Sequence, residues 1–194
     1  MIRKTLFVGA ILWAVIVPLA QAQTFGVGGS VGIVNDGSVD WTLDGFKRSE
    51  VTGWFDYRFE KSSLLRFTYG SMRIKQTHSE ETIVTPDGSV TVPKMKERVG
   101  YVTIGVSYLF WEGFFTSGIL AGIGGYGIRP DTVTPDVAAY ADRKETVFGW
   151  HIGSEAVFRV YKNLGIVGRL TYHNVSAHPH RQLLNADAGL VARF

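Results

Sequence analysis

A histidine and a serine near residue 175 are the first residues whose types suggest chemistry. A histidine that accepts the proton of a serine hydroxyl activates it as a nucleophile, and His173 and Ser176 lie three positions apart in Tyr172-His173-Asn174-Val175-Ser176. The surrounding residues predict a β-strand, in which an odd spacing places two side chains on opposite faces. Only a β-bulge would bring the two groups together. We therefore expect no catalytic residue, and we keep a lipid hydrolase using His173 and Ser176 as the alternative.

Two histidines are candidate metal ligands. His151 and His173 face each other if residues 145–160 and 164–175 form a hairpin, and His178 and His180 lie in the connection above them. A structural metal site needs further ligands and hydrogen bonds that orient them, and the sequence provides no obvious third ligand. We expect the two histidines to form hydrogen bonds with neighbouring side chains and to bind no metal.

A glycine-rich segment has the spacing of a dinucleotide-binding turn. Gly122-Ile123-Gly124-Gly125-Tyr126-Gly127 matches G-x-G-x-x-G, but that turn requires a following helix whose N-terminus faces the pyrophosphate. Ile128-Arg129-Pro130-Asp131 instead begins a loop. We interpret the glycines as strand residues that permit close packing, and we expect no cofactor.

The first 22 residues have the pattern of a cleavable signal peptide. Arg3 and Lys4 precede an apolar run from residue 6 to residue 20, and Ala20-Gln21-Ala22 is a small-x-small cleavage site. The run is short for a transmembrane helix, which needs roughly 20 residues. The sequence therefore predicts export, residues 23–194 as one mature domain, and an uncleaved anchor as the alternative.

The exported part is nearly neutral and contains no cysteine. Removal of residues 1–22 takes away the basic residues Arg3 and Lys4 and no acidic residue. The exported part therefore keeps 18 of the 20 Lys and Arg residues against 17 Asp and Glu. No basic run survives, and we expect no nucleic-acid partner. Because disulfides are impossible, strand pairing and packing must hold the fold.

Alternation of apolar and polar residues dominates the rest of the chain. In residues 145–160 one face carries Thr146, Phe148, Trp150, Ile152, Ala156, Phe158 and Val160, and the other carries Glu145, Gly149, His151, Gly153, Glu155 and Arg159. Similar runs predict eight strands, at about 24–34, 49–59, 64–74, 98–110, 114–129, 144–160, 164–175 and 182–194. The outward face of 114–129 stays open, because this segment does not alternate cleanly.

The connections alternate between long and short. Short links at 60–63, 111–113 and 161–163 separate longer ones, as in outer-membrane barrels with short periplasmic turns and longer outside loops. If Val160 pairs with Leu164, Glu155 lies opposite Arg169 and His151 opposite His173. We expect these four residues to form a polar network in the lumen, with the Glu155 carboxylate in contact with the Arg169 guanidinium.

The size of the aromatic residues decides which face points outward. An eight-stranded barrel has an interior just wide enough for side chains, and Phe55, Tyr57, Phe148, Trp150, Phe158 and Tyr172 would overfill it. Facing lipid, they and aromatic girdles that include Tyr108, Trp111 and Tyr161 suit a membrane. The sequence thus predicts an all-β, eight-stranded antiparallel up-and-down transmembrane β-barrel whose interior holds glycines, Ser30, Thr171 and paired charges. A wide pore needs about 16 strands, whereas narrow conductance stays open.

The C-terminal segment and three glycine-containing stretches carry a family resemblance. Residues 186–194 place Ala186, Ala188, Leu190, Ala192 and the terminal Phe194 on one face. With residues 121–127, 148–153 and 163–169, this resembles the outer-membrane β-barrel domain family of small opacity-type surface proteins. The resemblance implies the bacterial outer membrane, contact with its lipids, and an assembly signal at Leu190, Ala192 and Phe194 that is read by the barrel-assembly machinery. It implies no catalytic residues.

Two other interpretations accompany a structural, surface-interaction or adhesin-like role. The segment around His173 and Ser176 is similar to lipid A 3-O-deacylases, but those enzymes space the two residues by two positions. A soluble lipocalin-like periplasmic binder would reverse the sidedness. We expect a monomer, with loop 75–97 forming a hairpin around Pro86-Asp87-Gly88-Ser89 and offering the best surface for an extracellular partner.

Overall fold

The computed structural model describes residues 24–35, 48–75, 81–85, 88–92, 96–111, 113–130, 145–177 and 180–194. The predicted signal peptide at 1–22 lies outside them, as does His178. The barrel strands are β1 (Phe25–Asn35), β2 (Arg48–Glu60), β3 (Ser63–Lys75), β6 (Lys96–Trp111), β7 (Phe115–Pro130), β8 (Glu145–Tyr161), β9 (Leu164–Val175) and β10 (Arg181–Arg193). No helix in the described ranges is long and apolar enough to cross a membrane.

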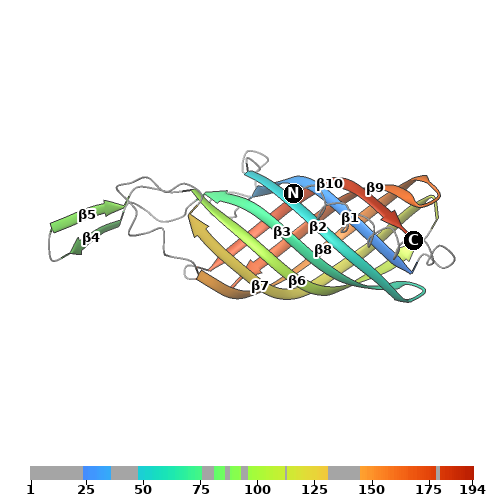
Figure 1. Cartoon of the computed structure of the whole chain (residues 1–194), viewed down its shortest axis with the longest axis horizontal. Coiled ribbons are helices and arrows are strands. Elements are labelled where there is room, and N and C mark those ends of the chain that lie inside the picture. The colour runs from blue at the N-terminus through green and yellow to red at the C-terminus, as the bar shows by residue number, and fades with distance from the viewer. Residues whose placement is uncertain are drawn as a thin grey trace, which may run out of the picture.

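These eight strands form a closed antiparallel barrel in the order β1-β10-β9-β8-β7-β6-β3-β2 (Figure 1). The predicted fold class and all eight predicted strands are confirmed, with boundaries shifted by at most two residues. Phe25 and Phe194 exchange backbone hydrogen bonds of 3.1 and 2.7 Å beside the β1–β10 ladder. Closure leaves no free edge, so every strand has two pairing partners.

The barrel has two different ends. We call the end with the short connections, at 61–62, 112–114 and 162–163, the turn end; Phe25 and Phe194 lie there too. The other is the loop end. Its connection between β3 and β6 contains the predicted hairpin as a separate two-stranded sheet, β4 (Glu81–Thr85) and β5 (Gly88–Val92), drawn beyond the barrel in Figure 1.

Strand register follows the prediction in the barrel centre and departs from it at one turn. Glu155 pairs with Arg169 and His151 with His173, as expected. Next to the turn, however, Tyr161 rather than Val160 pairs with Leu164, while Arg159 still pairs with Gly165. A β-bulge absorbs the extra residue at Val160, which shortens the turn without shifting the rest of the ladder.

Bulky apolar side chains face outward around the barrel. Phe148, Trp150 and Phe158 are 56%, 38% and 45% exposed, and Tyr57, Tyr108, Trp111 and Tyr161 are exposed as well. The outward face of β7, which the sequence left open, carries Ile119 and Ile123, and both are exposed. Tyr126 lies on the opposite face of the strand and is buried. The predicted sidedness of the aromatic face is confirmed.

Inward-facing glycines make room for inward-facing rings. A Cβ added to Gly28 would lie 2.1 Å from the Trp54 ring, and one added to Gly70 would lie 2.2 Å from the Tyr101 ring. Each glycine is the direct cross-strand partner of the ring that covers it. Gly122 is opposite His151 in the same way, with 2.6 Å to Cε1. The residue 122–127 glycines all lie on β7, and the predicted close packing holds for Gly122 and Gly124 but not for Gly125, where an added Cβ would meet nothing within 4 Å.

Candidate functional site

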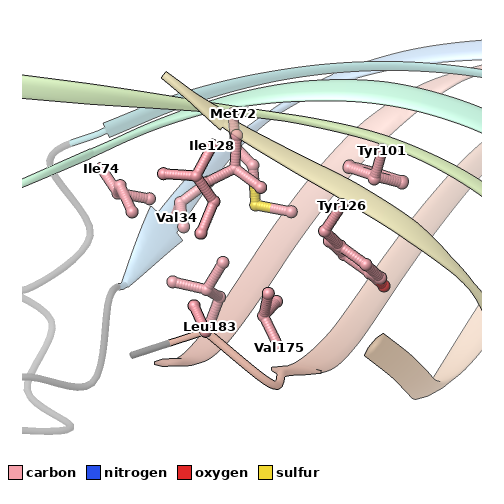
Figure 2. Packing of buried hydrophobic residues seen from close by; sticks show 10 residues of the cluster. Val34, Met72, Ile74, Tyr101, Tyr126, Ile128, Val175 and Leu183 are labelled. Carbon is pink, nitrogen blue, oxygen red and sulfur yellow. The ribbon is translucent and has the colours of Figure 1, made fainter. Parts of the chain in front are cut away.

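The lumen is filled in three layers: an apolar cluster at the loop end, a charged layer in the middle, and a second apolar cluster at the turn end. At the loop end a cluster of buried side chains, here called the loop-end plug, closes the interior (Figure 2). It consists of Val34, Met72, Ile74, Val99, Tyr101, Tyr126, Ile128, Val175, Ala177 and Leu183. At the turn end a smaller cluster, the turn-end plug, contains Trp54, Val157, Val167 and Val191. The expectation that small and charged groups alone fill the interior is therefore wrong: apolar side chains occupy both ends, because inward glycines free the volume they need.

The charged layer between the plugs is centred on Arg66. Its guanidinium binds Asp56 through Nε and Nη2, at 2.7 and 2.9 Å, and Glu155 through Nη1 and Nη2, at 2.6 and 3.1 Å. The Ser107 hydroxyl donates a further hydrogen bond of 3.1 Å to Glu155. All four side chains are buried. Removing any one of them would leave charge or hydrogen-bonding capacity unmatched among buried groups.

Arg169 belongs to a second ion pair and not to the first. It donates from Nε to Asp187 at 2.9 Å and from Nη2 to the Ser30 hydroxyl at 2.6 Å. The predicted contact between Glu155 and Arg169 is thus replaced by separate partners, although the two residues are opposed in the ladder. The reason is competition: Arg66 reaches Glu155 across the lumen from β3, which is not part of the β8–β9 hairpin.

Trp54 lies close to both arginines. The guanidinium carbon of Arg169 is 4.0 Å from the centroid of the Trp54 ring, and that of Arg66 is 5.5 Å from it. Attraction between a cation and the face of an indole strengthens when water is excluded. Trp54, the one buried tryptophan in the part of the chain that the structure describes, therefore connects the turn-end plug to both ion pairs.

The predicted histidine pair lies on the loop side of these ion pairs. The His151 and His173 rings have centroids 5.4 Å apart, and His173 Nδ1 is hydrogen-bonded to the Tyr126 hydroxyl at 2.9 Å. Tyr101 packs against His173 and donates a 2.6 Å hydrogen bond to Glu50. Among the residues that the structure describes, no group of three His, Cys, Asp or Glu side chains is arranged to hold a metal ion.

A small cavity lies among these polar groups. It has a volume of about 10 Å³ and is lined by side chains that include Glu50, His151, Arg169 and Asp187. Glu50 Oε2 and His151 Nδ1 are buried without a hydrogen-bond partner. A single water needs roughly 10–15 Å³ and two or more polar partners. The arrangement can thus hold one water but not an organic ligand.

The histidine and serine of the alternative hydrolase interpretation point in different directions. His173 is buried in the lumen and bonded to Tyr126, whereas Ser176 is exposed just beyond β9. No register shift interrupts β9 against β10 through Val175. The spacing of three positions therefore separates the two side chains, as a regular strand requires.

Several residues of the charged layer were not included in the lumen network that the sequence predicted. Asp56, Arg66, Asp187, Glu50 and Tyr101 form most of its contacts, and each lies at an inward position of a predicted strand. Strand parity could have placed them in the lumen. Their pairing could not be read, because it depends on which distant strands face each other across the closed barrel.

The proposed assembly signal lies on β10 and at its end. Leu190 is exposed on the outer wall, Ala192 and Phe194 are half-buried, and the Phe194 backbone pairs with Phe25. These positions are compatible with a role in assembly, which stays a prediction.

Comparison with known proteins identifies the fold. No protein-family model matches the chain, and no curated protein matches its sequence. The structure is similar to Neisserial surface protein A, with a TM-score of 0.60, 13% identity, and coverage of 88% of this chain and 97% of that one. It is also similar to the attachment invasion locus protein Ail of Yersinia pestis in complex with the heparin analogue sucrose octasulfate (0.53, 13%, 88% and 96%).

A third similar structure is the N-terminal β-barrel domain of Pseudomonas aeruginosa OprF, with a TM-score of 0.54, 11% identity, and coverage of 89% and 98%. At these identities the likeness concerns the fold. The class is therefore defined: a closed, all-antiparallel eight-stranded β-barrel with the fold of small outer-membrane proteins.

Proposed function

We propose that this chain is an integral protein of the bacterial outer membrane, where its barrel anchors a surface that interacts with partners outside the cell. The observation that supports this location is the apolar surface of the outer wall. Phe148, Trp150, Ile152 and Phe158 are all 38% to 56% exposed on one strand, and the neighbouring strands continue the apolar surface. In water an apolar surface of this extent promotes association. In a bilayer it is covered by acyl chains, and barrel closure satisfies the backbone groups that lipid cannot.

The filled lumen supports a role at the surface and not in the interior. Apolar plugs lie at both ends, and the charged layer between them leaves room for about one water. A soluble lipocalin-like binder would need apolar side chains around an internal cavity, which is the reverse of this arrangement. A hydrolase centred on His173 and Ser176 has no support in their geometry.

The β4–β5 hairpin is the best candidate for contact with a partner. It is a sheet of its own, paired from Glu81 with Val92 to Thr85 with Gly88, and it takes no part in the barrel ladder. One protein of the same fold is named for attachment and invasion. We therefore infer an adhesin-like role for the loop end.

Gel mobility tests the proposed location. Protein recovered from outer membranes should migrate faster before heating than after it, because a barrel without a free edge resists detergent until it is boiled. The same fractionation should place the protein with the outer membrane. Recovery in the soluble periplasm, or equal mobility before and after heating, would contradict the proposal.

Hairpin shortening tests the proposed role. Replacing residues 81–92 with Asn-Gly should leave the heat-dependent mobility shift intact, because the barrel strands are untouched. Adhesion of expressing cells to surfaces coated with extracellular-matrix proteins should fall to the level of cells without the protein. Undiminished adhesion in a correctly assembled variant would refute the role of the hairpin while leaving the membrane location standing.

A further inference from the structure

The lumen holds one buried carboxyl group that no guanidinium binds. Three carboxylates of the charged layer bind Arg66 or Arg169 in the ion pairs described above. A fourth carboxyl group, Glu50 of β2, is only 2% exposed and forms no ion pair with a described residue. Its contact is the uncharged hydroxyl of Tyr101, which donates to Oε1 at 2.6 Å. Four buried carboxyl groups thus share two guanidinium groups, and Glu50 binds neither of them.

Burial disfavours a negative charge on Glu50. A carboxylate taken out of water without a bonded counter-charge is so costly that the group takes up a proton instead. Both nearby cations, Arg66 and Arg169, already bind carboxylates. The titratable groups around Glu50 come from β3 and from β6 to β10: they are Arg66, Tyr101, Tyr126, His151, Glu155, Arg169, His173 and Asp187.

Two buried atoms without partners lie beside a space for one water. They are Glu50 Oε2 and His151 Nδ1, and both residues line the cavity of about 10 Å³. A carboxylic acid is a donor and a neutral imidazole nitrogen is an acceptor. One water can accept from the acid and donate to Nδ1, which satisfies both atoms. An ionised Glu50 with a proton on Nδ1 would satisfy them too, but it would leave the carboxylate charge unmatched.

We propose that Glu50 is a neutral carboxylic acid at neutral pH and that it shares its proton with His151 through one water. In this arrangement Oε1 is the carbonyl oxygen that accepts from Tyr101, and Oε2 carries the proton. The site goes beyond the proposed surface role and does not depend on it. Because the folded barrel keeps a proton that an unfolded glutamate releases, the lumen is a pH-sensitive element: this contribution to stability is present in acid and is lost as the pH rises.

Infrared spectroscopy of the protein refolded into detergent micelles tests the protonation state. At neutral pH the unaltered protein should show the carbonyl band of a protonated carboxyl group, and Glu50→Gln should lack it. Glu155→Gln is the matched control, because Arg66 binds Glu155 as a carboxylate, and it should keep the band. Loss of a carboxylate band in Glu50→Gln would overturn the proposal. Failure of Glu50→Gln to fold would do the same, because the amide replaces a group that carries no charge.

Proton release on unfolding provides the second test. In the unfolded chain a glutamate is ionised above about pH 5, so unfolding releases the proton of Glu50. The urea unfolding constant of the unaltered protein, divided by that of Glu50→Gln, should therefore rise about tenfold per pH unit between about pH 5 and neutral pH. The other titrating groups are common to both proteins. A ratio that does not change with pH would overturn the proposal.

Replacing His151 tests the path of the hydrogen bond. His151→Phe keeps a ring at this position but removes the acceptor, so the carboxyl band of Glu50 should shift in frequency. His180→Phe is the control, because His180 is exposed at the loop end and is bonded to Asn174; its band should stay in place. An unshifted band in His151→Phe would refute the sharing of the proton with His151.

Discussion

Arg66 illustrates how a single residue holds the interior together. It binds two carboxylates, from Asp56 on the adjacent strand and from Glu155 on the far side of the lumen, and its guanidinium also lies near the Trp54 ring. A buried ion pair contributes little net stability when compared with apolar groups of the same volume, but breaking one partner is costly. The carboxylates are therefore stable in the lumen only while Arg66 is present.

Replacing Arg66 with methionine should destabilise the barrel by about 3–5 kcal/mol, because two buried carboxylates lose their counter-charge. Urea unfolding of protein refolded into lipid vesicles would measure the change. Adding Asp56→Asn and Glu155→Gln to the same variant should recover most of the loss. A single Arg66→Met variant as stable as the control Lys61→Met would contradict this account of the charged layer.

A substitution at Gly70 would test the close packing between inward-facing rings and the glycines opposite them. A methyl group at residue 70 would overlap the Tyr101 ring and displace it from Glu50 and Thr52, with which its hydroxyl forms hydrogen bonds of 2.6 and 3.0 Å. Gly70→Ala should therefore cost about 1–3 kcal/mol, as overpacking usually does. Gly100→Ala, where the added Cβ meets nothing, is the control and should have no measurable effect on the same urea transition. Similar losses in both variants would indicate a general backbone effect.

At the scale of elements, the C-terminal strand completes the barrel. β10 pairs with β9 on one side and β1 on the other, and Phe194 adds two backbone hydrogen bonds to Phe25. The terminal residue can thus act through its ring, as an assembly signal, or through its backbone, as part of the closure. These contributions are separable by experiment.

Deleting Phe194 should lower the assembled fraction in cells while export continues, as measured by the heat-shifted band relative to total exported protein. Phe194→Ala keeps the backbone groups that bind Phe25. It should therefore refold normally in detergent yet assemble poorly in cells if the ring is the signal. Normal cellular assembly of both variants would refute a role for the terminus.

At the scale of the whole molecule, the lumen is layered from apolar to charged to apolar. The loop-end plug and the turn-end plug lie on either side of the charged layer, which contains the ion pairs of Arg66 and Arg169. The filled lumen supports the proposed role of the barrel as an anchor for the loop end. The sequence left narrow conductance open, and the two apolar plugs predict that the barrel conducts no ions.

Planar-bilayer recordings should show no steady ion current through the reconstituted protein, because an ion would have to cross both apolar plugs without water. A 16-stranded porin reconstituted in the same way serves as the positive control. Steady single-channel steps from this chain would show that one of the plugs opens in the membrane.

The sequence by itself determined the strands, their order of long and short connections, and the side on which bulky rings lie. These properties depend on period-two alternation and on the volume of an eight-stranded lumen, both of which are local or additive. The β8–β9 register was also readable, since one short turn sets it, and the bulge at Val160 did not shift Glu155 against Arg169.

Only the tertiary structure decided which inward residues touch. Glu155 binds Arg66 from β3 and not its cross-strand neighbour Arg169. The β3–β6 register spans a long connection, and contacts across the lumen depend on how the whole barrel closes. No short turn sets either one, so the information exists only when all eight strands are in place.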